Sequence, residues 1–168
     1  AMAGLMVVGH ASSIAAELRP GAAPWVAPAL LAACNLVGSL IGGRAADMVP
    51  ARVALTCVPL MSCAVLLILA GFGGPVSVLL CIGGLGFAYG ATISAYPPVI
   101  AKTVGPEASA LGYGRVFTAW GAAGLAGPWL AGAMFDVTGG YGLAMVLAAA
   151  IAVISAAAAW MVFSARQD

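Results

Sequence analysis

The sequence is short of charge. Only 7% of its 168 residues are charged, against about 25% in a typical soluble protein. Six basic and five acidic side chains cannot cover the surface of a soluble domain of this size, which excludes a soluble enzyme and a disordered chain. A net charge of +1 gives no basic patch, so we expect no nucleic acid among the partners.

Groups that hold metals or carry out catalysis are also scarce. The four cysteines lie singly in apolar runs without a CxxC pair, so we expect neither a disulfide framework nor a zinc site. The sequence has no HExxH motif, no paired carboxylates and no Ser–His–Asp set within reach of one another. It therefore predicts no enzymatic activity, no metal and no cofactor. No basic stretch precedes the apolar start, so no cleavable signal peptide is expected.

Hydrophobic residues dominate the chain, at 64%. The apolar runs are long and continuous rather than alternating, which indicates transmembrane helices and not barrel strands. We expect an all-α polytopic membrane protein in which residues 1–168 form a single six-helix domain in the lipid bilayer. The expected spans are about 2–18, 24–43, 52–71, 75–97, 109–133 and 141–164, with Pro97-Pro98 ending or kinking the fourth.

The basic residues predict an orientation. With six spans, Arg44, Arg52, Lys102 and Arg166 fall on one side of the membrane, and Arg19 falls on the other. Cytoplasmic loops carry the excess of basic residues, so the first group is expected in the cytoplasm. We therefore expect a bacterial-type inner (plasma) membrane protein, multi-pass, with both termini cytoplasmic.

The second half of the sequence repeats features of the first. Each half has a Gly-x-x-x-Asp pattern at the end of its middle span. Three spans per half is an odd number, so the halves would have opposite topology, as in the 3+3 inverted repeats of secondary transporters. A shift of 89 residues matches Gly38 with Gly127, Gly43 with Gly132, and Asp47 with Asp136.

The strongest motif surrounds Asp47, between the second and third spans. A carboxylate at a helix end, flanked by arginines across a tight loop, can lock two helices together on one membrane face. We expect such a conformational lock, whereas Lys102 is expected only to face headgroups. The alternative is an ordinary positive-inside loop in which Asp47 balances charge. The expected lock residues are Gly43, Arg44, Asp47 and Arg52.

This stretch resembles the loop between the second and third helix of each half of a major facilitator superfamily transporter, G-x-x-x-D-x-x-x-x-R. The tenth and eleventh helices of the oxalate–formate antiporter and monocarboxylate branch are similar to the runs 86–90, 97–98 and 113–121. The eighth helix of that branch is similar to residues 35–38. The resemblance covers nearly the whole chain but only the C-terminal six helices of a twelve-helix family. Ser39 and Trp120 stand where oxalate-type members carry cations, which argues against oxalate.

The resemblance implies half of a secondary transporter that moves a small organic anion, monocarboxylate-like, by alternating access. The site in this fold lies between two six-helix halves, so the expected partner is an N-terminal half, a separate chain or a second copy. The alternative is a half-transporter relic that serves as a structural or accessory subunit of a membrane complex.

Arg115 is the basic residue inside a span, about 9 Å from the expected helix start. A charge there is costly and marks a candidate site for an anionic substrate. Alternatively, its side chain extends to the headgroups or pairs with Glu107. His10, on one face with Ser13 and Glu17, is a candidate carrier of a coupling proton, or it contacts a neighbouring helix.

Tyr89, Thr92 and Tyr96 follow one another at i, i+3 and i+7, which predicts a shared helix face. The resemblance puts this span at the central cavity, where hydroxyls would orient an organic acid. An interface belt is the alternative, and it fits Tyr96 better than Tyr89. Asn35 and Trp120, on the segments similar to the eighth and eleventh helices, complete the expected substrate site.

Two small-residue patterns predict close helix approaches. They are Gly38-x-x-x-Gly42 and Gly86-x-x-x-Gly90. Spans 52–71 and 141–164 have few polar side chains and are expected to face lipid.

Overall fold

The computed structural model describes residues 2–18, 23–71 and 75–164, and these ranges form six helices and no strand. The expected all-α class is confirmed. Arg19 and Arg166, which contributed to the expected orientation, lie outside the described residues. The helices are α1 (Met2–Leu18), α2 (Val26–Met48), α3 (Ala51–Gly71), α4 (Pro75–Val104), α5 (Pro106–Thr138) and α6 (Gly142–Ser164).

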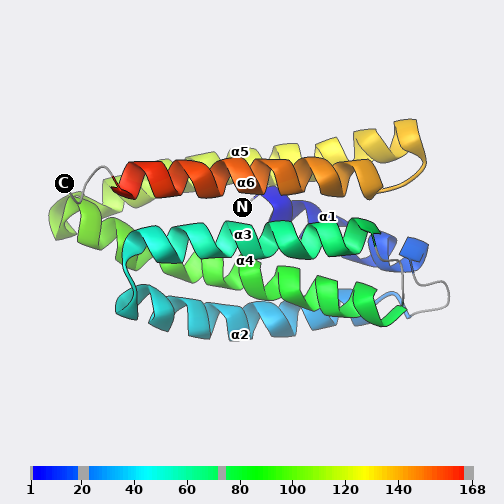
Figure 1. Cartoon of the computed structure of the whole chain (residues 1–168), viewed down its shortest axis with the longest axis horizontal. Coiled ribbons are helices and arrows are strands. Elements are labelled where there is room, and N and C mark those ends of the chain that lie inside the picture. The colour runs from blue at the N-terminus through cyan, green and yellow to red at the C-terminus, as the bar shows by residue number, and fades with distance from the viewer. Residues whose placement is uncertain (1, 19–22, 72–74, 165–168) are drawn as a thin grey trace.

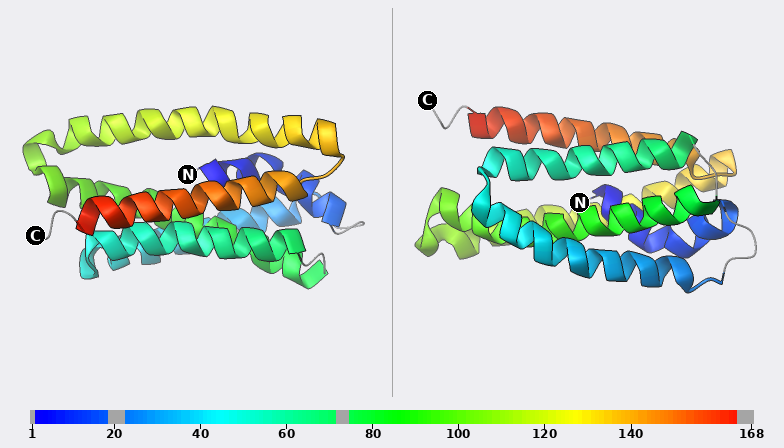
Figure 2. Two further views of the ribbon diagram at one scale, coloured as in Figure 1. Left: turned by 45° about the horizontal axis from the view of Figure 1, so that its top comes forward. Right: turned by 60° about the horizontal axis from the view of Figure 1, so that its bottom comes forward.

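The helices run side by side as a bundle (Figure 1). The most extensive contacts pair α2 with α4 and α3 with α6, while α3 also packs on α4 and α1 packs on α5 and α4. The connections from α2 to α3 and from α4 to α5 lie at one end of the bundle, and that from α5 to α6 lies at the other (Figures 1 and 2). Arg44, Arg52 and Lys102 therefore lie towards the same end.

The helices are longer than the sequence predicts at this end. Of the two expectations for Pro97-Pro98, an end or a kink of the fourth span, the end is wrong, because α4 continues through both prolines to Val104. A proline has no backbone N–H, so each one removes a single helical hydrogen bond. Ending the helix in an apolar solvent would leave more backbone groups unpaired, so the helix continues. A single residue, Gly105 with a φ of 82°, joins α4 to Pro106, the first residue of α5. Proline suits that position because its N–H would be unpaired there anyway.

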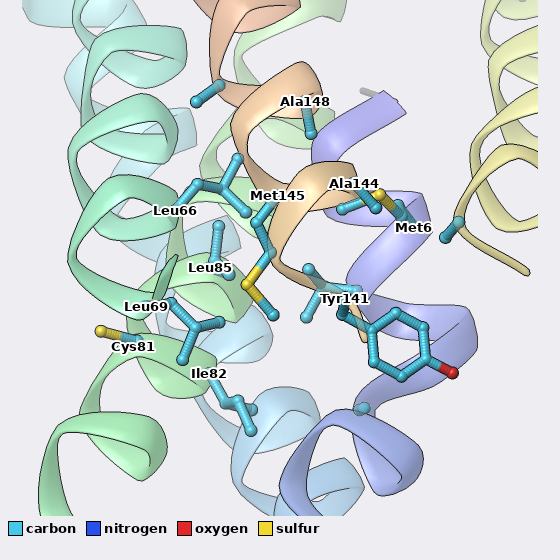
Figure 3. Packing of buried hydrophobic residues seen from close by; sticks show 14 of the residues in the cluster. Met6, Leu66, Leu69, Cys81, Ile82, Leu85, Tyr141, Ala144, Met145 and Ala148 are labelled. Atoms are coloured by element: carbon cyan, nitrogen blue, oxygen red, sulfur yellow. The ribbon is translucent and has the colours of Figure 1, made fainter. Parts of the chain in front are cut away.

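The main hydrophobic core lies between α1, α3, α4 and α6 (Figure 3). Leu66 and Leu69 from α3 and Ile82 and Leu85 from α4 are almost completely buried there. Helix α6 contributes alanines and Met145, so one face of this span packs in the core rather than against lipid. A smaller cluster joins Ala46, Ala95 and Val99 near the end of the bundle where α2 meets α3. No charged residue is buried as a whole in the described part of the chain, although the Arg52 Nε and Thr56 Oγ1 atoms are buried without a hydrogen-bond partner.

The backbones of α2 and α4 touch directly through glycines. A Cβ atom added to any of four glycines would overlap the backbone of the opposite helix. Backbone atoms cannot move aside as a side chain can, so only glycine fits at these positions. The close approach predicted from the two small-residue patterns is confirmed, and the two patterns face each other. The contacts are Gly38 with Phe87, Gly42 with Ala91, Gly86 with Leu31, and Gly90 with Asn35.

Four of the helices are long and apolar enough to cross a membrane: α2, α3, α4 from Val78 onward, and α6. These apolar helices indicate a membrane protein. Helix α1 has 17 residues, about 25 Å at the helical rise, which is shorter than the hydrocarbon core of about 30 Å. Helix α5 is longer but is rich in glycine and carries Glu107, Arg115 and Asp136.

The glycine contact gives a test of the packing. We expect Gly90→Ala to lower the free energy of unfolding by about 1–3 kcal/mol, because its methyl group overlaps the carbonyl of Asn35. Gly124→Ala is the matched control: Gly124 lies inside α5, and its added Cβ would meet only Leu5 Cδ1 at an ordinary contact distance of 3.6 Å, so this change should be neutral or stabilise by less than about 1 kcal/mol. Thermal unfolding in detergent measures both variants, and equal stability of the two would contradict the backbone contact.

The two ends of the bundle give a test of the topology. Met48, at the end of α2, and Val137, at the end of α5, are both strongly exposed and lie at opposite ends. Single cysteines at these positions, in a background without the four native cysteines, should react with an impermeant thiol reagent from opposite sides of the membrane. Labelling of both positions from the same side would exclude the six-span topology.

Candidate functional site

A partly enclosed cavity of about 90 Å³ lies between α1, α3, α4 and α6. Tyr89, Thr92 and Tyr96 of α4 line it together, so the predicted shared face is confirmed. Ser62 of α3 and Ser155 of α6 add two further hydroxyl groups. Two other hollows in the described part of the chain are lined by apolar and glycine residues, so the α4 hydroxyl face is the candidate binding surface.

The ring of Tyr89 lies against α1 at a position that requires a small residue. A Cβ on Gly4 would fall 2.5 Å from the Tyr89 ring, so glycine makes the space that the ring fills. Thr92 donates its hydroxyl hydrogen to the Ala88 carbonyl at 2.8 Å. Bonding of this kind leaves the threonine oxygen with free lone pairs. The α4 face therefore offers two phenol groups and one hydroxyl oxygen.

Trp120 of α5 joins this face through aromatic contacts. Its ring meets Tyr89 edge-on, with ring centroids 5.8 Å apart. Phe117 contacts Trp120 at 5.1 Å, and Tyr113 contacts Phe117 at 5.5 Å. Sequence reasoning gave Tyr113 and Phe117 no role, although their spacing to Trp120 at i, i+4 and i+7 already places the three on one helix face. We call these three residues with Tyr89 the aromatic row.

Arg115 lies between Tyr113 and Phe117 in the sequence of α5, and its side chain is exposed. Because α5 begins at Pro106 rather than near 109, Arg115 lies about 14 Å from the helix start, deeper than expected. Among the described residues it forms no ion pair with Glu107, so that alternative has no support. Arg115 does not line the cavity.

His10 and Asn35 also lie away from the cavity. The His10 ring contacts the Tyr141 ring at 5.4 Å, and its Nδ1 is 3.2 Å from the Met6 carbonyl oxygen. These contacts match the alternative in which His10 contacts a neighbouring element. Asn35 is partly buried in α2, where its backbone carbonyl faces Gly90. The structure therefore brings together Tyr89, Thr92 and Trp120, but not Arg115, His10 or Asn35.

The end of α2 is held by a lysine from α4. Lys102 Nζ lies 3.4 Å from Asp47 Oδ1, and it donates to the backbone carbonyls of Ala46 at 3.0 Å and Asp47 at 3.4 Å. The expectation that Lys102 only faces headgroups is wrong. Helix α2 has an acid and no basic residue in its last turn, which opposes the helix dipole, and Lys102 supplies the missing cation from another helix.

The predicted lock residues occupy the same end of the bundle. Arg44 and Asp47 lie within the last turns of α2, and only Val49 and Pro50 separate that helix from α3. Arg44 is exposed. A Cβ atom added to Gly43 would lie 3.6 Å from the Cβ atom of Ser94. Arg52 stacks on Trp160 of α6, with 5.1 Å from Cζ to the ring centroid. In the described residues Asp47 pairs with Lys102, and a lock that includes the two arginines stays a prediction.

The groups present limit the chemistry of the site. No set of three His, Cys, Asp or Glu residues that could hold a metal ion occurs in the described ranges. The cavity lining holds hydroxyls and aromatic rings but no charged side chain. Such a surface can bind and orient a small molecule. A comparison with known protein families and with curated proteins finds no match to this chain.

The lysine at the end of α2 gives a stability test. We expect Lys102→Gln to lower the free energy of unfolding by about 1 kcal/mol, since it removes an exposed ion pair and a cation at a helix C-terminus. Asp47→Asn should lower the free energy of unfolding by less than about 0.5 kcal/mol, because Lys102 keeps its contacts with the two backbone carbonyls. The change also removes a negative charge from the C-terminus of α2, where the helix dipole disfavours it. Chemical unfolding of both variants and of Arg44→Gln measures the order. A lock built on Arg44 would instead make Asp47→Asn and Arg44→Gln the most damaging changes.

Proposed function

We propose that the chain is one six-helix half of a secondary transporter of the major facilitator type, which moves a small organic anion by alternating access. The observation that carries the proposal is the exposed Arg115 within α5, which lies on the opposite face of that helix from the aromatic row. A cation in a span is expensive to leave facing lipid, and it suits an anionic substrate between two halves.

The outer face of α5 supports a second half as partner. Phe117, Leu125 and Trp129 are exposed along it, by 52%, 80% and 72%. Gly114 and Gly121 have no atom near an added Cβ, so another helix can approach closely there. In this proposal the partner covers the face and completes the substrate path, and Arg115 supplies its positive charge.

The packing of the helices supports the inverted repeat. Under the 89-residue shift α2 corresponds to α5 and α4 corresponds to α1, and α2 packs on α4 as α5 packs on α1. One matched glycine pair takes part in both contacts: Gly38 meets α4, and Gly127 meets α1 at Met2 and Met6. The other pair does not, because a Cβ atom added to Gly132 would meet no atom.

Arg115 provides the test of substrate binding. A charge-assisted hydrogen bond is worth about 1.5–3 kcal/mol, so Arg115→Gln should raise the half-saturating concentration of an organic anion about ten- to a hundredfold. Arg115→Lys should recover part of the loss, since it keeps the charge but not the two-pronged geometry. Uptake of labelled short carboxylates by cells that express the gene measures both variants, with surface expression checked in parallel.

Glu107→Gln is the control for this experiment. Glu107 is exposed at the start of α5 and should leave uptake unchanged. If Arg115→Gln behaves like Glu107→Gln, and lysine fully replaces the arginine, Arg115 serves only to contact headgroups. If cells show no uptake of any carboxylate above background, the accessory-subunit alternative replaces the transporter proposal.

A further inference from the structure

The cavity between α1, α3, α4 and α6 is lined by polar groups, yet no charged residue lines it. It lies inside the six-helix bundle, whereas the substrate path proposed above lies outside it, along α5. We propose that this cavity binds a small uncharged molecule that carries hydroxyl groups, such as a short diol. This inference does not depend on the transporter proposal, because it concerns a site that this chain forms by itself.

The size of the cavity limits the ligand. An apolar protein cavity of about 150 Å³ holds benzene, which is about 25 Å³ for each non-hydrogen atom. At the same volume per atom, a cavity of about 90 Å³ has room for about four non-hydrogen atoms. A two-carbon diol has this size. A sugar or an aromatic acid would extend beyond this volume.

The hydroxyl groups of the cavity supply acceptors. Thr92 donates its hydrogen to Ala88, and Ser62 donates its hydrogen to the Val58 carbonyl at 3.2 Å. Each of these two oxygens therefore faces a ligand as an acceptor only. Pro59 has no N–H, so the Leu55 carbonyl lacks its usual helical donor, and both residues line the cavity. These acceptors require a ligand that donates hydrogen bonds.

The phenol groups supply the complementary donors. Tyr89 and Tyr96 each carry an O–H that can donate to a ligand oxygen. A hydroxyl group both donates and accepts, so a diol satisfies both kinds of partner. A carboxylate or an ammonium would be held without an opposite charge, which is far more costly than binding a neutral polar group. The lining therefore selects against ions of either sign.

The binding test uses ethylene glycol and acetate, two probes with the same number of non-hydrogen atoms. Saturation-transfer NMR on the whole chain in lipid nanodiscs should detect ethylene glycol, with a dissociation constant on the order of 0.1 mM or weaker for so small a ligand. Acetate at neutral pH should give no signal above that of empty nanodiscs. Acetate binding as tight as that of the diol would overturn the proposal, as would a cavity that holds water only and gives no diol signal.

Variants locate the site. Tyr96→Phe and Thr92→Val should each raise the dissociation constant of ethylene glycol about three- to tenfold, the effect of one neutral hydrogen bond. Thr103→Val is the matched control, because Thr103 makes the same kind of bond to a carbonyl on α4 but lies outside the cavity. Ala152→Leu should abolish binding by filling the cavity. If that variant does not fold, the near-isosteric Tyr96→Phe still decides, and equal affinity of Tyr96→Phe, Thr92→Val and Thr103→Val would overturn the proposal.

Discussion

The direct contact between the backbones of α2 and α4 sets the arrangement of the other helices. In lipid, apolar side chains gain little by leaving the solvent, so close van der Waals packing has to hold helices together. Glycines such as Gly38 and Gly90 allow this packing and also fix the rotation of α4. The face of Tyr89 and Tyr96 lies about a third of a turn from the glycine face, and it is therefore directed at the cavity between α1, α3 and α6.

Lys102 fixes the same helix pair at its end. Helix α2 ends with an acid, and its last carbonyls are satisfied by a cation from the last turn of α4. The glycine contact and the lysine contact therefore act on the same two helices, one in the middle and one at the end. A motion that separates α2 from α4 has to break both, so we expect these two helices to move together as one rigid unit.

Two polar features of different chemistry occur in this chain. The cavity inside the bundle is neutral and lined by hydroxyls, whereas Arg115 is exposed on α5 outside it. Tyr89 belongs to both, because its ring contacts Trp120 and also lines the cavity. A molecule in the cavity would thus contact a ring of the aromatic row.

Sequence reasoning alone predicted the apolar class, the six helices and the residues that share one helix face, such as Tyr89, Thr92 and Tyr96. These features follow from composition and from the helical period, both of which are local. Only the tertiary structure decided that Lys102 meets Asp47, that Trp120 meets Tyr89 and that His10 meets Tyr141. Such contacts depend on how each helix is rotated and shifted along its axis. Helices that are apolar all round carry almost no amphipathic signal to fix that rotation, so it is set by the fit of small residues between helices.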